Sequence, residues 1–288
     1  MEAYSAAVRP LPGVAATSRR QTLAKQMVAS IRRQDYREFI RTRPIDPARV
    51  NPGSPMFDPE RAAVLHARAG RMDEAIWLVF LATHFGRHRN HHWVRVRDVY
   101  SGLGSGIWTW ARVCSSPGAF RAWLDSHAGA ISGGCGSHRK YESLVGAKGT
   151  GAVVEGLVAW AGSVGSLAGR FATLVREAGN DPHVIFDHIY RSFQVVRFGR
   201  LGRFDLLSVM GRLGILPIEP GSAYLKGATG PLRGAHLLFG GDPLAAKEVV
   251  LEAWLLDLDQ HLEIGMEVME DSLCNWQKNP DTFVHFRG

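Results

Sequence analysis

Three carboxylates stand where the neighbouring residue types can support acid–base or charge-stabilising chemistry. Asp271 has Asn275 and Lys278 at spacings of four and seven residues, which places all three on one side of a predicted helix. Asp205 and Arg212, which are seven residues apart, likewise share one side of another predicted helix. A carboxylate in such a setting can stabilise a developing positive charge or activate water. The alternative for each is an ordinary exposed ion pair, worth about 0.3 to 0.5 kcal/mol.

The third carboxylate, Glu142, lies in a glycine-rich segment at 133–144, GGCGSHRKYESL. Glycines permit close backbone approach to a ligand, and a lysine such as Lys140 beside a glutamate is a common acid–base pairing. We rank the catalytic candidates in the order Asp271, Asp205 and Glu142. An alternative is that Glu142 only caps the loop or pairs with an adjacent cation. The residues predicted to bind substrate are His138, Arg139, Lys140, Tyr141, Arg191, Asn275, Trp276 and Gln277.

A basic run at 86–97, GRHRNHHWVRVR, holds four arginines and three histidines together with one tryptophan. Such a run can grip phosphates and offer a ring for stacking, with a solvated basic face as the alternative. His84 and His88 have the spacing of two metal ligands on a helix, but Gly86 lies between them and no carboxylate completes the set. We therefore predict no metal site and no cofactor. The predicted DNA contacts of this run are Arg87, Arg89, His92 and Arg95.

The segment at 219–242, EPGSAYLKGATGPLRGAHLLFGGD, predicts a glycine turn followed by a helix. In a helix-hairpin-helix DNA grip, an apolar residue and two close glycines precede a helix whose N-terminal amides hold a phosphate. Leu225, Gly227 and Gly230 follow this order, although the glycines are one residue further apart than in the commonest form. A plain packing loop is the alternative. The predicted DNA contacts here are Lys226, Gly227, Gly230 and Arg233.

Charge and composition narrow the class of protein further. The chain carries 34 Lys and Arg against 27 Asp and Glu, and a net charge of +7 favours a polyanionic partner over a mere solubility surplus. Its cysteines, at 114, 135 and 274, lack CxxC spacing, which argues against disulfides and iron–sulfur clusters and favours the cytoplasm. No apolar run reaches the roughly 18 residues needed to span a bilayer. Motifs of P-loop, Rossmann, hydrolase-elbow and zinc-protease type are missing, which disfavours ATP-dependent and zinc chemistry.

The elements that must position these residues are predicted to be helices, because apolar residues recur at spacings of three and four and alternating strand patterns are missing. We therefore expect an all-α fold. An N-terminal arm and basic helix at 1–55 would precede a helical catalytic domain at 56–288, with an irregular proline-rich connector at 42–59. The predicted helices cover 21–40, 59–69, 72–85, 117–127, 151–160, 167–178, 183–198 and 204–213, and a strong helical stripe covers 243–278.

Five strings of this sequence together resemble clade 3 of the α-glutamyl/putrescinyl thymine pyrophosphorylases, from about Phe57 to the C-terminus. They are HRKYESL at 138–144, FDHIYRS at 186–192, GRFDLLSVMGRLG at 202–214, EPGSAYLKGATGPLRGAHLLFGG at 219–241 and MEDSLCNWQKNP at 269–280. The resemblance implies an all-α fold related to the helix-hairpin-helix DNA glycosylases and a role in phage–host conflict over modified bases. Related proteins of this clade include antiphage glycosylases that excise glucosylated hydroxymethylcytosine from DNA and leave abasic sites.

Three functions remain open on these grounds. The first is a glycosylase that flips a bulky modified pyrimidine out of double-stranded DNA and uses one of the three carboxylates. In a variant of it, Lys140 attacks the sugar as an amine and adds strand nicking. The second is a transferase that substitutes the exocyclic carbon of thymine with release of pyrophosphate. The third is a DNA-binding module without enzymatic activity. We expect no membrane association and no obligate protein partner.

Overall fold

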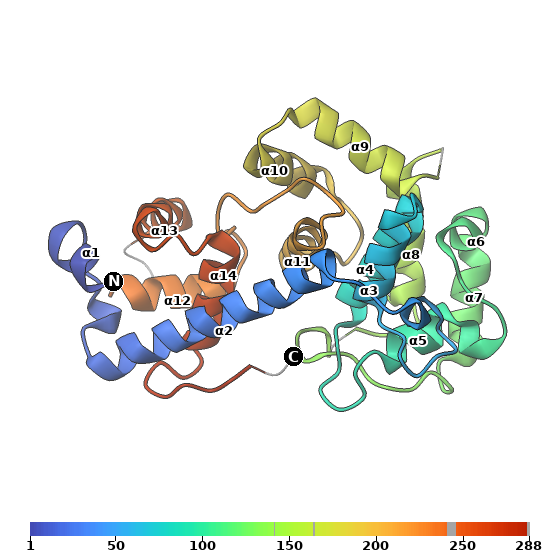
Figure 1. Cartoon of the computed structure of the whole chain (residues 1–288), viewed down its shortest axis with the longest axis horizontal. Coiled ribbons are helices and arrows are strands. Elements are labelled where there is room, and N and C mark those ends of the chain that lie inside the picture. Colours follow the sequence, from blue (N-terminus) through green and yellow to red (C-terminus); the bar gives the residue numbers. More distant parts are fainter. Residues whose placement is uncertain (141, 164, 241–245, 287–288) are drawn as a thin grey trace. The chain divides into compact units, whose positions relative to one another are not determined.

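The structure is a computed structural model that describes residues 1–140, 142–163, 165–240 and 246–286, except for the side chain of His138. Within these residues the fold is all-helical and contains no strand, which confirms the all-α part of the prediction (Figure 1). None of the described helices is long and apolar enough to cross a bilayer. The α-helices are α1 (Glu2–Ala7), α2 (Thr17–Thr42), α3 (Pro59–Arg68), α4 (Met72–Phe85), α5 (Val94–Tyr100), α6 (Trp110–Ser115), α7 (Pro117–His127), α8 (Thr150–Ala161), α9 (Leu167–Ala178), α10 (Pro182–Ser192), α11 (Arg200–Arg212), α12 (Gly230–Phe239), α13 (Glu248–Leu262) and α14 (Met266–Trp276).

Short 3₁₀ turns supplement these helices at η1 (Pro12–Val14), η2 (Pro47–Val50), η3 (Gly102–Gly104) and η4 (Ser137–Arg139). The chain divides into two compact units. Among the described residues, unit 1 consists of Met1–Tyr36 and residues 220–286, and unit 2 of Arg37–Glu219. Helix α2 contributes residues to both.

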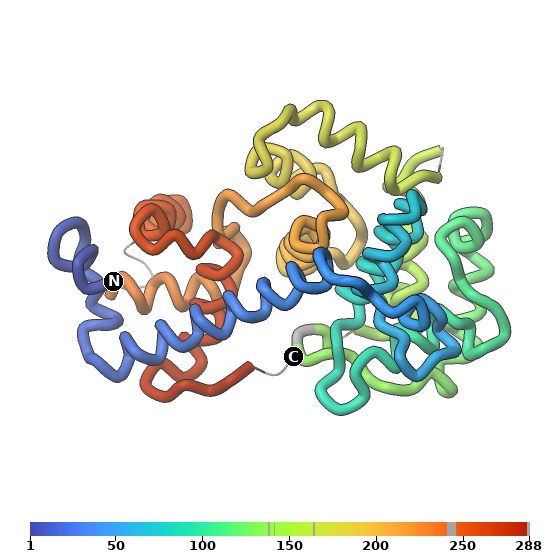
Figure 2. The backbone as a smooth tube through the Cα atoms, viewed as in Figure 1, coloured from blue at the N-terminus to red at the C-terminus, as the bar shows by residue number. Residues whose placement is uncertain are grey.

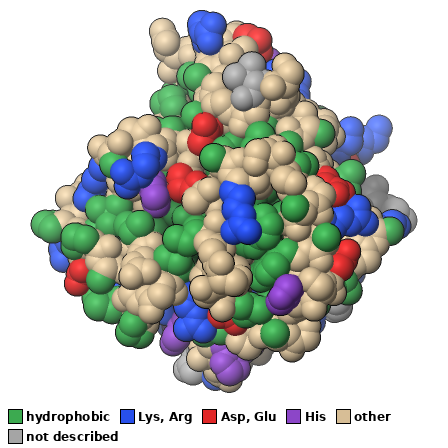
Figure 3. All heavy atoms as spheres, turned by 90° about the vertical axis from the view of Figure 1, so that its right-hand side faces the viewer, with side chains coloured by type: hydrophobic (Ala, Val, Ile, Leu, Met, Phe, Trp, Pro, Cys, Tyr) green, Lys and Arg blue, Asp and Glu red, His purple; other side chains and the backbone are tan. Residues whose placement is uncertain are grey.

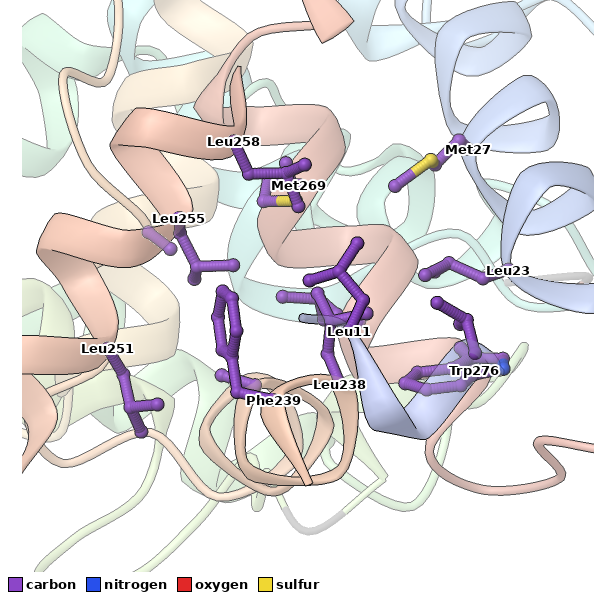
Figure 4. Packing of buried hydrophobic residues seen from close by; sticks show 14 of the residues in the cluster. Leu11, Leu23, Met27, Leu238, Phe239, Leu251, Leu255, Leu258, Met269 and Trp276 are labelled. Atoms are coloured by element: carbon purple, nitrogen blue, oxygen red, sulfur yellow. The ribbon is translucent and has the colours of Figure 1, made fainter. Parts of the chain in front are cut away.

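Unit 1 is built around a cluster of buried apolar side chains (Figure 4). Leu255 and Leu258 of α13, Met269 of α14 and Leu238 of α12 have no exposed surface in this cluster. Complete burial of one such side chain stabilises the fold by about 1.5 to 3 kcal/mol. The first twenty residues, where the sequence shows no sustained period, contain α1 and η1. They place Tyr4, Leu11 and Val14 in the same core.

The apolar stripe predicted at 243–278, of which 243–245 lie outside the described residues, serves two helices, α13 and α14, so the prediction of one continuous helical stretch is wrong at Glu263–Gly265. Glu263 has φ 51° and Gly265 has φ 81°, and both values lie in the left-handed region that interrupts a right-handed helix. The Asp259 carboxylate accepts the backbone N–H groups of Ile264 at 3.1 Å and Gly265 at 3.0 Å. These bonds end α13 and set the start of α14, which carries Asp271.

Helix α4 is the central element of unit 2, because every residue from Ala75 to Phe85 is buried. A helix that is apolar on all sides must be covered on all sides. Helices α3, α9 and α11 supply that cover. The Trp77 indole donates to the Trp108 carbonyl at 2.8 Å, which joins α4 to the segment before α6.

The helix ends in unit 2 follow local capping chemistry. The Asp181 carboxylate accepts the N–H of His183 at 2.8 Å and begins α10, with Pro182 in the first turn. Two predicted bounds are corrected here. Helix α10 ends at Ser192 instead of 198, because Phe193 leaves the helical region with ψ 84°, and α11 begins at Arg200 instead of 204.

Candidate functional site

Asp271 lies on α14 in unit 1 and takes part in a chain of polar contacts. Its carboxylate pairs with Arg33 of α2, and the two side chains are 28% and 30% exposed. The Asn275 amide donates to the Asp271 carboxylate at 2.8 Å and accepts from the Lys278 ammonium at 2.9 Å. The predicted Asp271–Asn275 contact on one helix face is therefore present. Lys278, in contrast, lies beyond the end of α14 at Trp276 and reaches Asn275 from the following turn. The carboxylate is partly exposed and contacts Arg33 directly and Lys278 only through the Asn275 amide.

Arg33 is a component of this group that sequence reasoning missed. Its Nη1 atom is buried and has no hydrogen-bond partner among the described residues. The centre of the guanidinium lies 5.9 Å from the Phe286 ring, and the Lys278 ammonium lies 5.5 Å from the same ring. The group thus combines a carboxylate, two cations, an amide and an aromatic ring. A buried donor without a partner is uncommon in a folded protein.

Helix α12 fixes the position of α14 through two glycines. A Cβ at Gly230 would lie 2.6 Å from the Cys274 sulfur, and a Cβ at Gly234 would lie 2.5 Å from the Leu273 carbonyl oxygen. The absence of side chains therefore lets the two helices approach closely. Trp276 has no exposed surface and donates to the Pro280 carbonyl at 3.2 Å, so its ring packs in the core and is not presented to a base.

The turn before α12 has a glycine at the position that needs one. Gly227 has φ 75°, and the Ala228 N–H donates to the Leu225 carbonyl at 2.8 Å. The Glu252 carboxylate of α13 accepts the Leu225 N–H. Sequence reasoning missed Glu252, which lies 27 residues from its partner. No helix directly precedes this turn, because α11 ends at Arg212 and the residues between are irregular.

Among the predicted DNA contacts of this segment, the backbone at Gly227 is exposed and Gly230 packs on α14. Lys226 and Arg233 are exposed on either side of the turn and the first turn of α12. Gln277, predicted to bind substrate, donates to the Cys274 carbonyl at 3.2 Å.

The other two carboxylates lie in unit 2, where arginines hold them. Arg139 donates to the Asp205 carboxylate at 2.9 Å, with 9% of the Arg139 side chain exposed against 33% of Asp205. Arg197 approaches Glu142 at 3.8 Å. Asp205 therefore has a partner from a distant segment, and Arg212, its predicted neighbour on the same helix, lies 3.4 Å from the Glu219 carboxylate.

His84 lies beside these arginines and is fully buried. Its ring shares a hydrogen bond of 2.9 Å with the Thr150 hydroxyl, which donates to the Ser143 carbonyl at 3.0 Å. Burial lowers the pKa of His84 to about 3, and Arg139 and Arg197 act in the same direction. The imidazole is therefore neutral at physiological pH, and the network it begins anchors the 142–150 segment.

The glycine-rich segment and the basic run pack against each other in unit 2 (Figure 2). The Gly136 N–H donates to the Phe85 carbonyl at 2.8 Å. A Cβ at Gly133 would lie 2.7 Å from the backbone nitrogen of Arg95. Arg95 also donates to the Cys135 sulfur at 3.5 Å. Burial raises the pKa of the Cys135 thiol, against the opposing effect of Arg95.

The remaining predicted residues are spread over the surface of unit 2. Arg87, Arg89, His92 and Lys140 are exposed. Arg191 is exposed and pairs with Asp187 at 2.9 Å. Tyr141 lies outside the described residues, as does the side chain of His138. Among the described residues, no group of three or more His, Cys, Asp and Glu side chains could hold a metal ion.

The model of one protein family, described as alpha-glutamyl/putrescinyl thymine pyrophosphorylase clade 3, matches residues 18–288. No curated protein matches the chain, and neither does any solved structure. The matched region includes both groups of site residues described above, in unit 1 and in unit 2.

Proposed function

The chain belongs to clade 3 of the alpha-glutamyl/putrescinyl thymine pyrophosphorylases, and from this premise we propose that it is a DNA glycosylase related to the helix-hairpin-helix enzymes, with the glycine turn and the helix after it, α12, as its part of that motif. Its substrate would be a hypermodified pyrimidine in double-stranded phage DNA, with glucosylated hydroxymethylcytosine as the first choice. Its product would be an abasic site, formed in the cytoplasm as an antiviral defence. The family supports the coarser part of this proposal, an enzyme that acts on modified thymine or related DNA bases.

One observation carries the proposal: a glycine turn suited to a phosphate and a partly exposed carboxylate lie on two helices packed face to face. The turn at Gly227 leads into α12, and Gly230 and Gly234 of α12 lie directly against α14. Helix α14 presents Asp271. A DNA backbone held by the amides at the start of α12 would therefore have a fixed relation to the carboxylate.

The chemistry asked of Asp271 is modest. As the N-glycosidic bond breaks, positive charge develops on the sugar, and a nearby carboxylate stabilises it or activates water. Water supplies the hydroxyl that bonds to C1′ and the proton that leaves with the base. Arg33 pairs with the Asp271 carboxylate and keeps it oriented. Extrusion of the base costs a few kcal/mol, which phosphate contacts from the exposed Lys226 and Arg233 of the same unit would help to offset.

A transferase that releases pyrophosphate is the second candidate, favoured by the two arginines of unit 2. Arg139 and Arg197 both lie close enough to His84 to lower its pKa. Two guanidinium groups in one neighbourhood suit a pyrophosphate, although each also faces a carboxylate, Asp205 and Glu142 respectively. The product separates the two candidates, because transfer leaves the base in the DNA.

The test is incubation of the purified full chain with DNA that carries glucosylated hydroxymethylcytosine, and with unmodified DNA of the same sequence. Mass spectrometry detects a released base, and an abasic-site assay detects the remaining sugar. We expect release from the modified DNA alone. A modified base that stays in the DNA with a new mass would establish the transferase. Binding that leaves the DNA unchanged would refute the glycosylase assignment for this base and favour the binding module.

A further inference from the structure

The loop between α5 and α6 has an unusual backbone. Four of its residues have positive φ: Gly102 at 59°, Leu103 at 55°, Gly104 at 86° and Gly106 at 142°. Three of them are glycines, for which such angles carry no steric penalty. Leu103 is a branched residue in a left-handed conformation that disfavours it. A strained residue persists where the surrounding structure holds it, and such residues concentrate at functional sites.

The loop is held by its own hydrogen bonds and by the core. The Gly104 N–H donates to the Ser101 carbonyl at 3.0 Å, and the Trp108 N–H donates to the Tyr100 carbonyl at 2.8 Å. The ring of Trp108 is buried at the base of the loop. These contacts fix the conformation of the loop without using the Leu103 side chain.

The tip of this loop presents apolar side chains to the outside. Leu103 is 36% exposed and Ile107 is 42% exposed. On the side of unit 2 where α6 and α7 lie, apolar and basic side chains occur close together (Figure 3). A rigid loop with two apolar side chains at its tip has the form of a wedge that inserts between stacked bases.

A cation stands beside the wedge. Arg112 donates to the Gly106 carbonyl at 3.0 Å, and its guanidinium lies 3.7 Å from the centre of the Trp108 ring. The residue is exposed, so a phosphate can approach it. Helix α5 carries Arg95 and Arg97 of the basic run and leads directly into this loop. The loop is therefore flanked along the chain by arginines on both sides, Arg97 before it and Arg112 after it, which suits contact with a phosphate backbone.

We infer that Leu103 is the wedge that enters the base stack of duplex DNA and fills the space left when the target nucleotide is extruded, with Arg112 contacting the adjacent phosphate. This inference rests on the proposed function, for which it supplies the unstacking element. It does not depend on which carboxylate performs the chemistry.

The experiment uses the full chain and a duplex with one glucosylated hydroxymethylcytosine followed by 2-aminopurine, whose fluorescence rises when it is unstacked. Leu103→Ala should reduce the fluorescence rise and slow base release about tenfold, equivalent to about 1.4 kcal/mol. Leu103→Met should retain both signals, because it keeps an apolar side chain of similar length on the same backbone. The matched control is Val184→Ala, which removes an exposed apolar side chain from α10 of the same unit. Thermal unfolding verifies that each variant folds.

The outcomes separate the wedge from the glycosylase assignment. A fluorescence rise that depends on Leu103 without any base release supports the wedge and refutes the glycosylase. A wild-type rise and wild-type base release in Leu103→Ala overturn the wedge and leave the glycosylase intact. No fluorescence rise with the wild-type chain bound to the duplex also overturns the wedge.

Discussion

Gly234 of α12 lies so close to Leu273 of α14 that a Cβ at position 234 would be 2.5 Å from the Leu273 carbonyl oxygen. The neighbouring atom is backbone, so it cannot move aside as the end of a side chain would. Residue 234 must therefore be a glycine for α14, and with it Asp271, to keep its position.

Gly234→Ala is expected to lower the free energy of unfolding by about 1 to 3 kcal/mol, because the added methyl group pushes α12 and α14 apart. Urea unfolding followed by circular dichroism measures the change. Gly118→Ala is the control, since Gly118 is helical and a Cβ there meets nothing within 4 Å. We expect the control to be neutral or slightly stabilising. Equal stability of Gly234→Ala and the wild type would refute the close packing.

Asp271→Asn is expected to slow base release about a hundredfold or more, the usual range for a group that acts in the transition state. The amide keeps the size of the carboxylate, so the fold should be retained. Asp187→Asn is the matched control, because Asp187 is also a helical aspartate paired with an arginine. The control should remain within about twofold of the wild type. Single-turnover rates on modified DNA give both values.

The carboxylates of unit 2 provide a discriminating comparison. If Asp271 carries the chemistry, Asp205→Asn and Glu142→Gln should affect base release less than Asp271→Asn does. Asp205→Asn should still lower stability slightly, since it removes the charge that faces the buried Arg139. The opposite ranking, with Asp205→Asn inactive and Asp271→Asn active, would move the active site to unit 2.

Two buried histidines make stability depend on pH. Burial lowers the pKa of His66 to about 4 and that of His84 to about 3, from an ordinary value of 6.5. Below pH of about 6.5 the unfolded chain binds protons at these positions and the folded chain does not. Stability should therefore be fully retained above this pH and fall towards pH 4, by about 1.4 kcal/mol per pH unit for each histidine.

Urea unfolding at several pH values measures this slope. His84→Gln should reduce the slope by the share of one histidine, because glutamine does not titrate. His92→Gln, which replaces an exposed histidine, is the control with which the slope of His84→Gln is compared. A wild-type stability that is flat between about pH 6.5 and 4 would contradict the burial of both imidazoles as neutral rings.

The basic run should control the salt dependence of DNA binding. Replacement of the exposed Arg87 and Arg89 by alanine is expected to make the slope of log K against log salt shallower by about 0.9 for each lost phosphate contact. Arg176→Ala removes an exposed arginine from α9 and is the control. Fluorescence anisotropy at several salt concentrations gives the slopes. An unchanged slope in the double variant would place the phosphate contacts elsewhere.

The sequence predicts the helices well where local chemistry determines their ends. The bounds of α4, α7 and α9 are as predicted, because proline, capping side chains and glycine define them locally. It fails at Glu263–Gly265, where a left-handed turn interrupts an apolar stripe that continues on both sides. Periodicity alone does not reveal such a break, since the stripe serves the same core before and after it.

The site is predictable only in part, for a related reason. The Asp271–Asn275 contact follows from helical spacing, and so does the Asp187–Arg191 pair. The partners that hold the acids come from distant segments: Arg33 lies 238 residues from Asp271, and Arg139 lies 66 residues from Asp205. Tertiary packing creates these pairs, so no local sequence pattern predicts them.

Unit 1 is built from two segments that are far apart in the sequence, so its core can form only late in synthesis on the ribosome. Tyr4, Leu11 and Val14 are synthesised first, yet their core partners on α12, α13 and α14 follow only after all of Arg37–Glu219. At about 5 to 20 residues per second, the wait lasts roughly ten seconds or more. During that time unit 2, which is continuous, can fold. The N-terminal apolar residues stay without their core partners in the meantime, and such exposed apolar surface favours aggregation.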